Sequence, residues 1–378
     1  MSGNLKREAA KKAYIIMVFD GLCVSSASVI LSLLRQQYDL SYDLSGTLLA
    51  LLSVGNLLSG LLCAALPQFL GTKTTVLSLS AGLAAGYVLL VLSGNPVILL
   101  LAFLLIGLGK GSTMNSGTVV AGQAATDRTK CVNIINALFA VGSLAAPVLY
   151  LASNQMQFWK APLCALAVSG LMVWLLFAGM GLSSDRKEAK RDNDTGFLRE
   201  RHFWYTVCFM FFQQCTEISV TGWLVTYFKD QGILTGALSE LTVTVIWLAM
   251  LVGRLAIAFV LPQNSRLRSL FVMSIASLVT YVLLLVSNSG GIALLCLFLF
   301  GVSESGCYPT GIAQANRSMN NATMGVLLPA AGIGAIVMPY VVGAVAERWG
   351  IFAGMVCPGI TIVGMVLFAV LLGRQKTD

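Results

Sequence analysis

The chain has 378 residues, of which 57% are hydrophobic and 11% are charged, and its mean hydropathy is +0.83. A soluble domain carries about 25% charged residues, so this composition excludes a soluble globular protein. The net charge of +8 would suit a nucleic-acid partner, but the basic residues gather in connections between apolar runs. We therefore expect a lipid bilayer as the surrounding medium and no nucleic acid as a partner.

Apolar runs of roughly 20 residues follow one another along the whole chain, each long enough to cross about 30 Å of hydrocarbon as a helix. Backbone groups in lipid must satisfy their own hydrogen bonds, so the runs predict helices and an all-α integral membrane protein. The twelve expected spans are 13–35, 45–66, 74–92, 97–121, 131–151, 161–180, 204–228, 238–261, 269–287, 291–314, 322–343 and 351–372.

The basic residues predict the orientation of these spans. Most of the 24 Lys and Arg residues lie before the first span, in alternate connections, in the middle connection and after the last span. Because Lys and Arg remain on the cytoplasmic side, we expect both termini to be cytoplasmic, in a multi-pass protein of the cell (inner) membrane. The basic start leads straight into a long first span, so we expect no cleavable signal peptide.

One long polar connection, residues 183–202, divides the chain near its midpoint. Weak repeats flank this connection: "GLLCAALPQ" at 60–68 resembles "GRLAIAFVLPQ" at 253–263, and "GSLAAP" at 142–147 resembles "GAIVMP" at 334–339. Two matches at similar offsets predict a duplicated six-helix unit. The expected domains are an N-terminal bundle at 1–182, a cytoplasmic linker at 183–202 and a C-terminal bundle at 203–378.

Ionisable residues inside the spans are few, and they are costly in hydrocarbon unless they are paired or face water. Asp20, Lys110, Glu217 and Glu304 lie on the first, fourth, seventh and tenth spans. Asp20 and Glu217 are 197 residues apart, and Lys110 and Glu304 are 194 apart, close to the repeat offset. We expect the four side chains to converge on one wet chamber between two halves. An Asp20–Lys110 pair is feasible by depth, either as a static ion pair or as a site that couples proton release to binding.

Polar side chains surround the two glutamates. Gln213 and Thr221 lie four residues before and after Glu217, on one helix face, and Trp223 follows. Tyr308 lies four residues after Glu304. Hydroxyl groups of a sugar can bond to such polar groups while its C–H faces stack on rings, although Trp223 also fits an interfacial aromatic belt. We predict these residues as part of a solute site.

Three further residues suit a structural or gating role. Arg254 lies about two turns from the cytoplasmic end of the eighth span, where it can reach water or neighbouring carbonyl groups. Pro147 and Pro339 lie inside spans and are expected to bend them.

The chain resembles the major facilitator superfamily in its twelve spans, its basic central loop and its paired halves. "EISVTGWLVTYF" in the seventh span, "MNSG" with Asn115, "GCYPTGIAQAN" and "GAIVMPYVVGAVAERWG" resemble the fucose/glucose–proton symporter branch. The resemblance implies two six-helix bundles, alternating access, and proton-driven uptake of a monosaccharide that Asn115 helps to bind. It also implies proton coupling through Asp20, which we extend to Glu217 and Glu304.

One departure from the branch leaves alternatives open. The fourth span reads "GLGKGSTMNSG", with Lys110 where sugar symporters tend to carry an acid, so an anionic sugar acid or carboxylate bound by Lys110 is a second hypothesis. A proton-coupled drug or metabolite exporter and a non-transporting receptor are further ones. The sequence offers no Ser/His/Asp set, metal cluster or phosphate loop, so we expect no enzyme, metal or cofactor. We expect a monomer, with a small solute and protons as its other partners.

Overall fold

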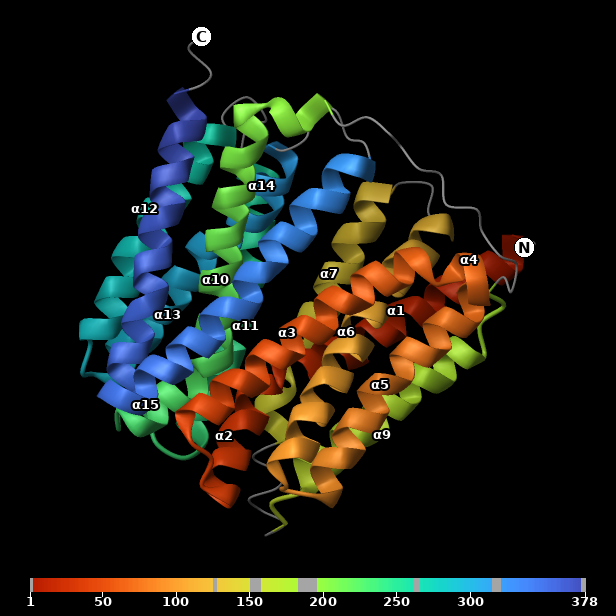
Figure 1. Ribbon diagram of the computed structural model, residues 1–378, viewed down its shortest axis with the longest axis horizontal. Coiled ribbons are helices and arrows are strands. Elements are labelled where there is room, and N and C mark those ends of the chain that lie inside the picture. The colour runs from red at the N-terminus through yellow and green to blue at the C-terminus, as the bar shows by residue number, and fades with distance from the viewer. Residues whose placement is uncertain are drawn as a thin grey trace. The chain divides into compact units, whose positions relative to one another are not determined.

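The computed structural model describes residues 3–124, 128–149, 158–182, 196–260, 266–314 and 321–374. The regular structure within these ranges is entirely helical (Figure 1). The chain divides into two compact units. Unit 1 comprises Met1–Leu40 and Thr47–Lys190, and unit 2 comprises Ser41–Gly46 and Arg191–Asp378.

Unit 1 is built from the helices of the first half of the chain. They are α1 (Gly3–Ser25), α2 (Ala27–Tyr38), most of α3 (Tyr42–Ala65), α4 (Pro67–Leu70), α5 (Thr72–Leu92), α6 (Pro96–Ala124), α7 (Arg128–Leu144) and α9 (Ala161–Ala178). Helix α1 packs against α6, α7 and α9, and α5 packs against α6 and α9. Two lysines donate to the carbonyl groups that end helices, Lys12 to Gly179 at 2.6 Å and Lys160 to Val91 at 2.8 Å.

Unit 2 is centred on α10, which packs along α15. Its helices are η1 (Gly196–Arg199), α10 (Arg201–Asp230), α11 (Ala237–Val260), α12 (Arg266–Val286), α13 (Gly290–Glu304), α14 (Cys307–Gln314) and α15 (Asn321–Arg374). The first turn of α3 also belongs to this unit. The Tyr42 hydroxyl donates to Asp230 at 2.7 Å, and the Tyr42 backbone N–H donates to Glu347 at 2.7 Å. These bonds attach the start of α3 to the end of α10 and to the segment of α15 just before its break at Gly350.

The twelve predicted spans are confirmed, with several differences in continuity. Helix α15 contains the last two spans, separated at Gly350, whose positive φ of 83° breaks the helix. The first expected span is divided into α1 and α2 at Ser26, where the hydroxyls of Ser25 and Ser26 bond to backbone carbonyls four residues earlier. Such back-bonding bends helices. The tenth span is divided into α13 and α14.

The predicted effect of proline on the helices varies with position. Helix α7 ends at Leu144, three residues before Pro147. Helices α13 and α14 are separated at Ser305 and Gly306, and the ring of Pro309 would clash with the carbonyl of Ser305. By contrast, α15 keeps helical backbone through Pro339.

Glycines allow close helix packing in unit 1. A Cβ atom placed on Gly82 would lie 2.5 Å from the Leu105 carbonyl oxygen, and one on Gly86 would lie 2.6 Å from that of Ala102. Helices α5 and α6 can therefore approach at a distance that no larger residue would permit.

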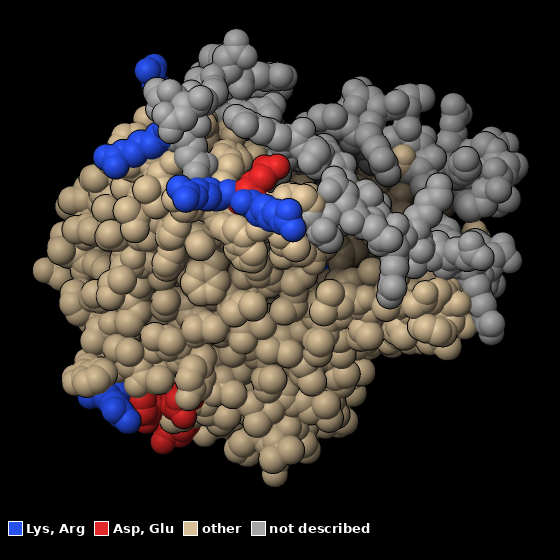
Figure 2. Space-filling model, turned by 45° about the horizontal axis from the view of Figure 1, so that its top comes forward, with Lys and Arg blue, Asp and Glu red and all other residues tan. Residues whose placement is uncertain are grey.

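Figure 2 shows how charged side chains of the described residues are distributed on one face. On the face in Figure 2, the Lys, Arg, Asp and Glu side chains lie in two groups separated by a broad band that has neither. Nine helices of the described ranges are long and apolar enough to cross a membrane. Helix α10 is not among them, although it has 30 residues. It carries the polar side chains of the site.

Candidate functional site

Helix α10 presents a polar stripe in the middle of unit 2. Because residues four apart lie on one helix face, Gln213 and Glu217 are neighbours, and the Gln213 Nε2 donates to Glu217 Oε2 at 2.6 Å. The Thr221 hydroxyl donates to the Glu217 backbone carbonyl at 2.6 Å. Gln213 is fully buried, whereas Glu217 and Thr221 are partly exposed. The stripe therefore leads from an accessible surface into the core.

A second carboxylate meets this stripe from α13. Glu304, the last residue of α13, is 1% exposed. Its Oε1 accepts from the same Gln213 Nε2 at 3.3 Å, and its Oε2 accepts from the Ser277 hydroxyl of α12 at 3.1 Å. Gln213 thus bridges two carboxylates. No Lys or Arg forms an ion pair with either carboxylate within the ranges that the structure describes.

The orientation of the bridging amide is fixed by its neighbour. Gln214 Nε2 donates to Gln213 Oε1 at 2.9 Å. The carbonyl end of the Gln213 amide is therefore occupied, and both of its N–H groups face the carboxylates. Two carboxylates that share one donor repel each other, and a single positive charge bound at the pair would relieve that repulsion.

A cation and two further titratable groups lie near the pair. The Tyr308 hydroxyl of α14 lies within electrostatic range of Glu217 and of Arg254 on α11, and the Cys307 thiol lies within range of both glutamates. The Nε of Arg254 is buried without a hydrogen-bond partner. Arg254 therefore lies within electrostatic range of Tyr308, a residue of the predicted solute site.

Unit 1 contains the other predicted charges. Asp20 on α1 is fully buried, and neither of its carboxylate oxygens has a hydrogen-bond partner among the described residues. Lys110 on α6 lies within electrostatic range of Asp20. Asn115 is exposed one turn further along α6. The arrangement places an acid and a base near each other without a direct contact between them.

The structure brings some of the predicted site residues together and separates others. Gln213, Glu217 and Glu304 form one hydrogen-bonded cluster. Trp223 is fully buried nearly three turns from Gln213, and its indole N–H donates to the Pro339 carbonyl at 3.1 Å. The solute contact of Trp223 and the gating roles of Arg254, Pro147 and Pro339 stay predictions. So does the convergence of the four charged side chains on one chamber.

Sequence reasoning missed two members of the cluster. Ser277 is one of several serines in α12, and no charge or motif distinguishes it. Gln214 follows Gln213 directly, but adjacent helical residues point about 100° apart, so a search for a stripe with a four-residue spacing passes over it. The pair of adjacent glutamines in an apolar span was the available signal.

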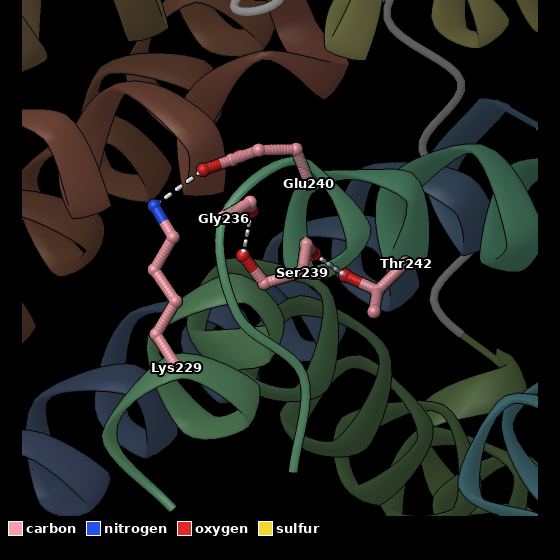
Figure 3. A network of polar contacts seen from close by, with 5 residues as sticks. All are labelled: Lys229, Gly236, Ser239, Glu240 and Thr242. Carbon is pink, nitrogen blue, oxygen red and sulfur yellow. Dashed lines mark hydrogen bonds and ion pairs between the residues drawn. The ribbon is translucent and has the colours of Figure 1, made fainter. Parts of the chain in front are cut away.

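A second buried glutamate lies near the end of α10. Lys229 donates to Glu240, in the first turn of α11, at 2.5 Å (Figure 3). Hydroxyl bonds order the same turn: Ser239 donates to the Gly236 carbonyl at 2.7 Å and Thr242 to the Ser239 carbonyl at 2.5 Å. Among the described residues, no group of three or more His, Cys, Asp or Glu is placed to hold a metal ion.

Comparison with known proteins gives consistent results. The sequence model of the Major Facilitator Superfamily matches residues 13–328. A TsgA homolog from Buchnera aphidicola subsp. Baizongia pistaciae (strain Bp) is 18% identical over 323 residues, with 80% of this chain and 81% of that protein covered.

Solved structures share the fold. A variant of the nucleoside transporter NupG has a TM-score of 0.77 and 14% identity, with 98% of this chain and 99% of that chain covered. A variant of the E. coli fucose:proton symporter FucP has a TM-score of 0.63 and 15% identity, with 96% and 98% covered. At these identities the similarity establishes the fold alone.

Proposed function

Because this chain belongs to the Major Facilitator Superfamily, we propose that it is a proton-coupled importer of a small polar solute, with sugars as the leading class. The observation that carries the proposal is the Gln213 amide, which bridges Glu217 and Glu304 in the interior of unit 2. A carboxylate pair that forms no ion pair with Lys or Arg, as among the described residues here, can take up and release a proton as its surroundings change.

The working cycle is alternating access. The N-terminal bundle at 1–182 and the C-terminal bundle at 203–378 would rock about a central solute site, joined by the cytoplasmic linker at 183–202. Residues 183–195 of that linker lie outside the described residues. We place the protein in the inner membrane with both termini in the cytoplasm, as the basic connections indicate.

Each unit contributes an acid to the proposed coupling. Asp20 lies fully buried in unit 1, and its carboxylate has no hydrogen-bond partner among the described residues. Glu217 and Glu304 lie in unit 2. The partly exposed Glu217 and Thr221 and the buried Gln213 offer both donors and acceptors to a solute. Such a mixed set suits hydroxyl groups, which donate and accept.

The second candidate is transport of an anionic sugar acid or carboxylate. Lys110 supports this candidate, because it is partly buried on a membrane helix within electrostatic range of an acid that it does not contact directly. A solute carboxylate would then compete with Asp20 for the lysine. Loss of anion binding in Lys110→Ala, with neutral solutes unaffected, would identify this mode.

Uptake into liposomes tests the leading proposal. We expect an inward proton gradient to drive accumulation of at least one of L-fucose, D-glucose, uridine, D-glucuronate and lactate, and Asp20→Asn to lower the driven rate by at least about tenfold. Asp39→Asn is the matched control, since Asp39 is exposed and has the left-handed conformation that asparagine tolerates. Uptake that ignores the proton gradient in the wild type would overturn the proposal.

A further inference from the structure

The hydrogen bond between Gln213 and Gln214 is unusual because it joins consecutive residues of one helix. Their Cα–Cβ bonds point about 100° apart, so the side chains must bend toward each other for the 2.9 Å bond to form. The long side chain of Gln214 reaches the side-chain carbonyl oxygen of Gln213 and donates to it. Its effect falls on the opposite end of that amide, which faces the two carboxylates.

The Gln213–Gln214 hydrogen bond determines whether the Gln213 amide presents its N–H groups or its oxygen to the two carboxylates. While Gln214 donates to Gln213 Oε1, the Gln213 amide gives its N–H groups to Glu217 and Glu304. Without that donor, the amide can turn over and present its oxygen to the pair. Donors favour the ionised carboxylates, whereas an acceptor favours a proton between them.

Gln214 and Glu217 are the members of this chain of bonds that are partly exposed. Gln213 and Glu304 are buried, but Gln214 is partly exposed, as are Phe211, Ile218 and Thr221 on the same face of α10. An amide directed at lipid would lose its hydrogen bonds at considerable cost. We therefore infer that the strip formed by these four residues faces water. A solute in that water can reach Gln214 but not the buried Glu304.

We propose that Gln214 is the positioning residue through which a bound solute acts on the Glu217–Glu304 pair, and that the solute offers it a hydroxyl or carbonyl oxygen. This inference rests on the proposed function, because it supplies the step that links solute to proton. A solute oxygen accepts from Gln214 Nε2 and competes with Gln213 Oε1 for that donor. The Gln213 amide turns, and the pair takes up one proton.

Other groups around the pair are not bonded to Gln214. Cys307 and Tyr308 of α14 lie within electrostatic range of the pair, Arg254 of α11 lies within range of Tyr308, and α12 contributes the neutral Ser277. Between α15 and α10, Thr216 is bonded to Thr361 at 2.7 Å. A substitution of Gln214 therefore leaves these neighbours in place.

Infrared titration of the protein in vesicles of E. coli lipid tests the proposal, with pH as the sole variable. The carboxylic acid band of Glu304 is assigned by its loss in Glu304→Gln. We expect two variants, Gln214→Met and Gln214→Asn, to move the midpoint of this band by about one pH unit toward higher pH, a tenfold change in proton affinity. Asparagine is one methylene too short to reach Gln213 Oε1. Gln231→Met, at the exposed end of α10, should leave the midpoint unchanged.

A double variant shows whether the effect passes through Gln213. We expect Gln213→Met to move the midpoint as well, and Gln213→Met combined with Gln214→Met to move it no further. An unmoved band in both Gln214 variants, or shifts that add in the double variant, would overturn the inference. Because the titration needs neither solute nor gradient, it gives an answer even if wild-type uptake proves independent of protons.

Discussion

Helix α10 contacts two buried glutamates, and the partners bonded to them differ in charge. Glu240 is fully buried and meets the ammonium group of Lys229, which is 9% exposed. Glu304 is 1% exposed, and its hydrogen-bond partners among the described residues are neutral, the amide of Gln213 and the hydroxyl of Ser277. Both acids carry the desolvation cost of burial. Of these two glutamates, Glu240 has a directly bonded cation in the part of the chain that the structure describes.

This difference separates a structural ion pair from a site with a variable charge. The Lys229–Glu240 pair holds the end of α10 to the start of α11, in a turn further ordered by serine and threonine hydroxyls (Figure 3). At Glu217 and Glu304 no Lys or Arg forms an ion pair among the described residues. We propose that a proton, which binds and leaves during the transport cycle, supplies the positive charge there.

The largest effect on stability is expected at the ion pair. Lys229→Met leaves Glu240 as a buried charge without its bonded cation, which typically costs about 3–5 kcal/mol in unfolding free energy. Thermal unfolding of the purified protein in detergent measures the loss. The double variant Lys229→Met/Glu240→Leu removes both charges and should recover most of it. A Lys229→Met protein as stable as the wild type would show that the pair does not hold these helices.

A smaller effect is expected at the carboxylate pair. Ser277→Ala removes one neutral donor to Glu304, worth about 1 kcal/mol, which corresponds to about 0.7 pH unit in the titration of that acid. The sign is toward higher pH, because the lost bond favoured the ionised form. Infrared titration of the Glu304 band measures the shift. Thr280→Ala is the matched control, three residues later on α12 and bonded to the Ala276 carbonyl. Equal shifts in the two variants would contradict a specific role for Ser277.

The sequence was sufficient to predict the spans and part of the cluster. Long apolar runs predict helices because lipid leaves the backbone no other partner, and the four-residue spacing of Gln213 and Glu217 predicts their contact. What could not be predicted depends on tertiary packing. Nothing in α12 distinguishes Ser277 from Ser274 until α13 is placed beside it. The start of α3 joins unit 2 through bonds to Asp230 and Glu347, which lie almost two hundred residues or more away.

Local chemistry also altered two predicted elements. The expected span 13–35 contains adjacent serines whose hydroxyls bond back to the helix and interrupt it at Ser26. The sequence predicts that the Trp223 ring stacks on a solute. In the structure this ring is buried in unit 2, and its N–H donates to the Pro339 carbonyl. The serine bonds are local, whereas the Trp223 bond depends on which helix lies opposite, information that a single sequence does not contain.

The most direct measurement of the central claim compares two transport modes of Glu304→Gln in proteoliposomes. Glutamine keeps the shape of the side chain but cannot take up a proton. We predict that this variant loses gradient-driven accumulation by at least about tenfold while it still exchanges labelled for unlabelled solute across the membrane. Accumulation at the wild-type level would contradict the claim that the Glu217–Glu304 pair carries the coupled proton.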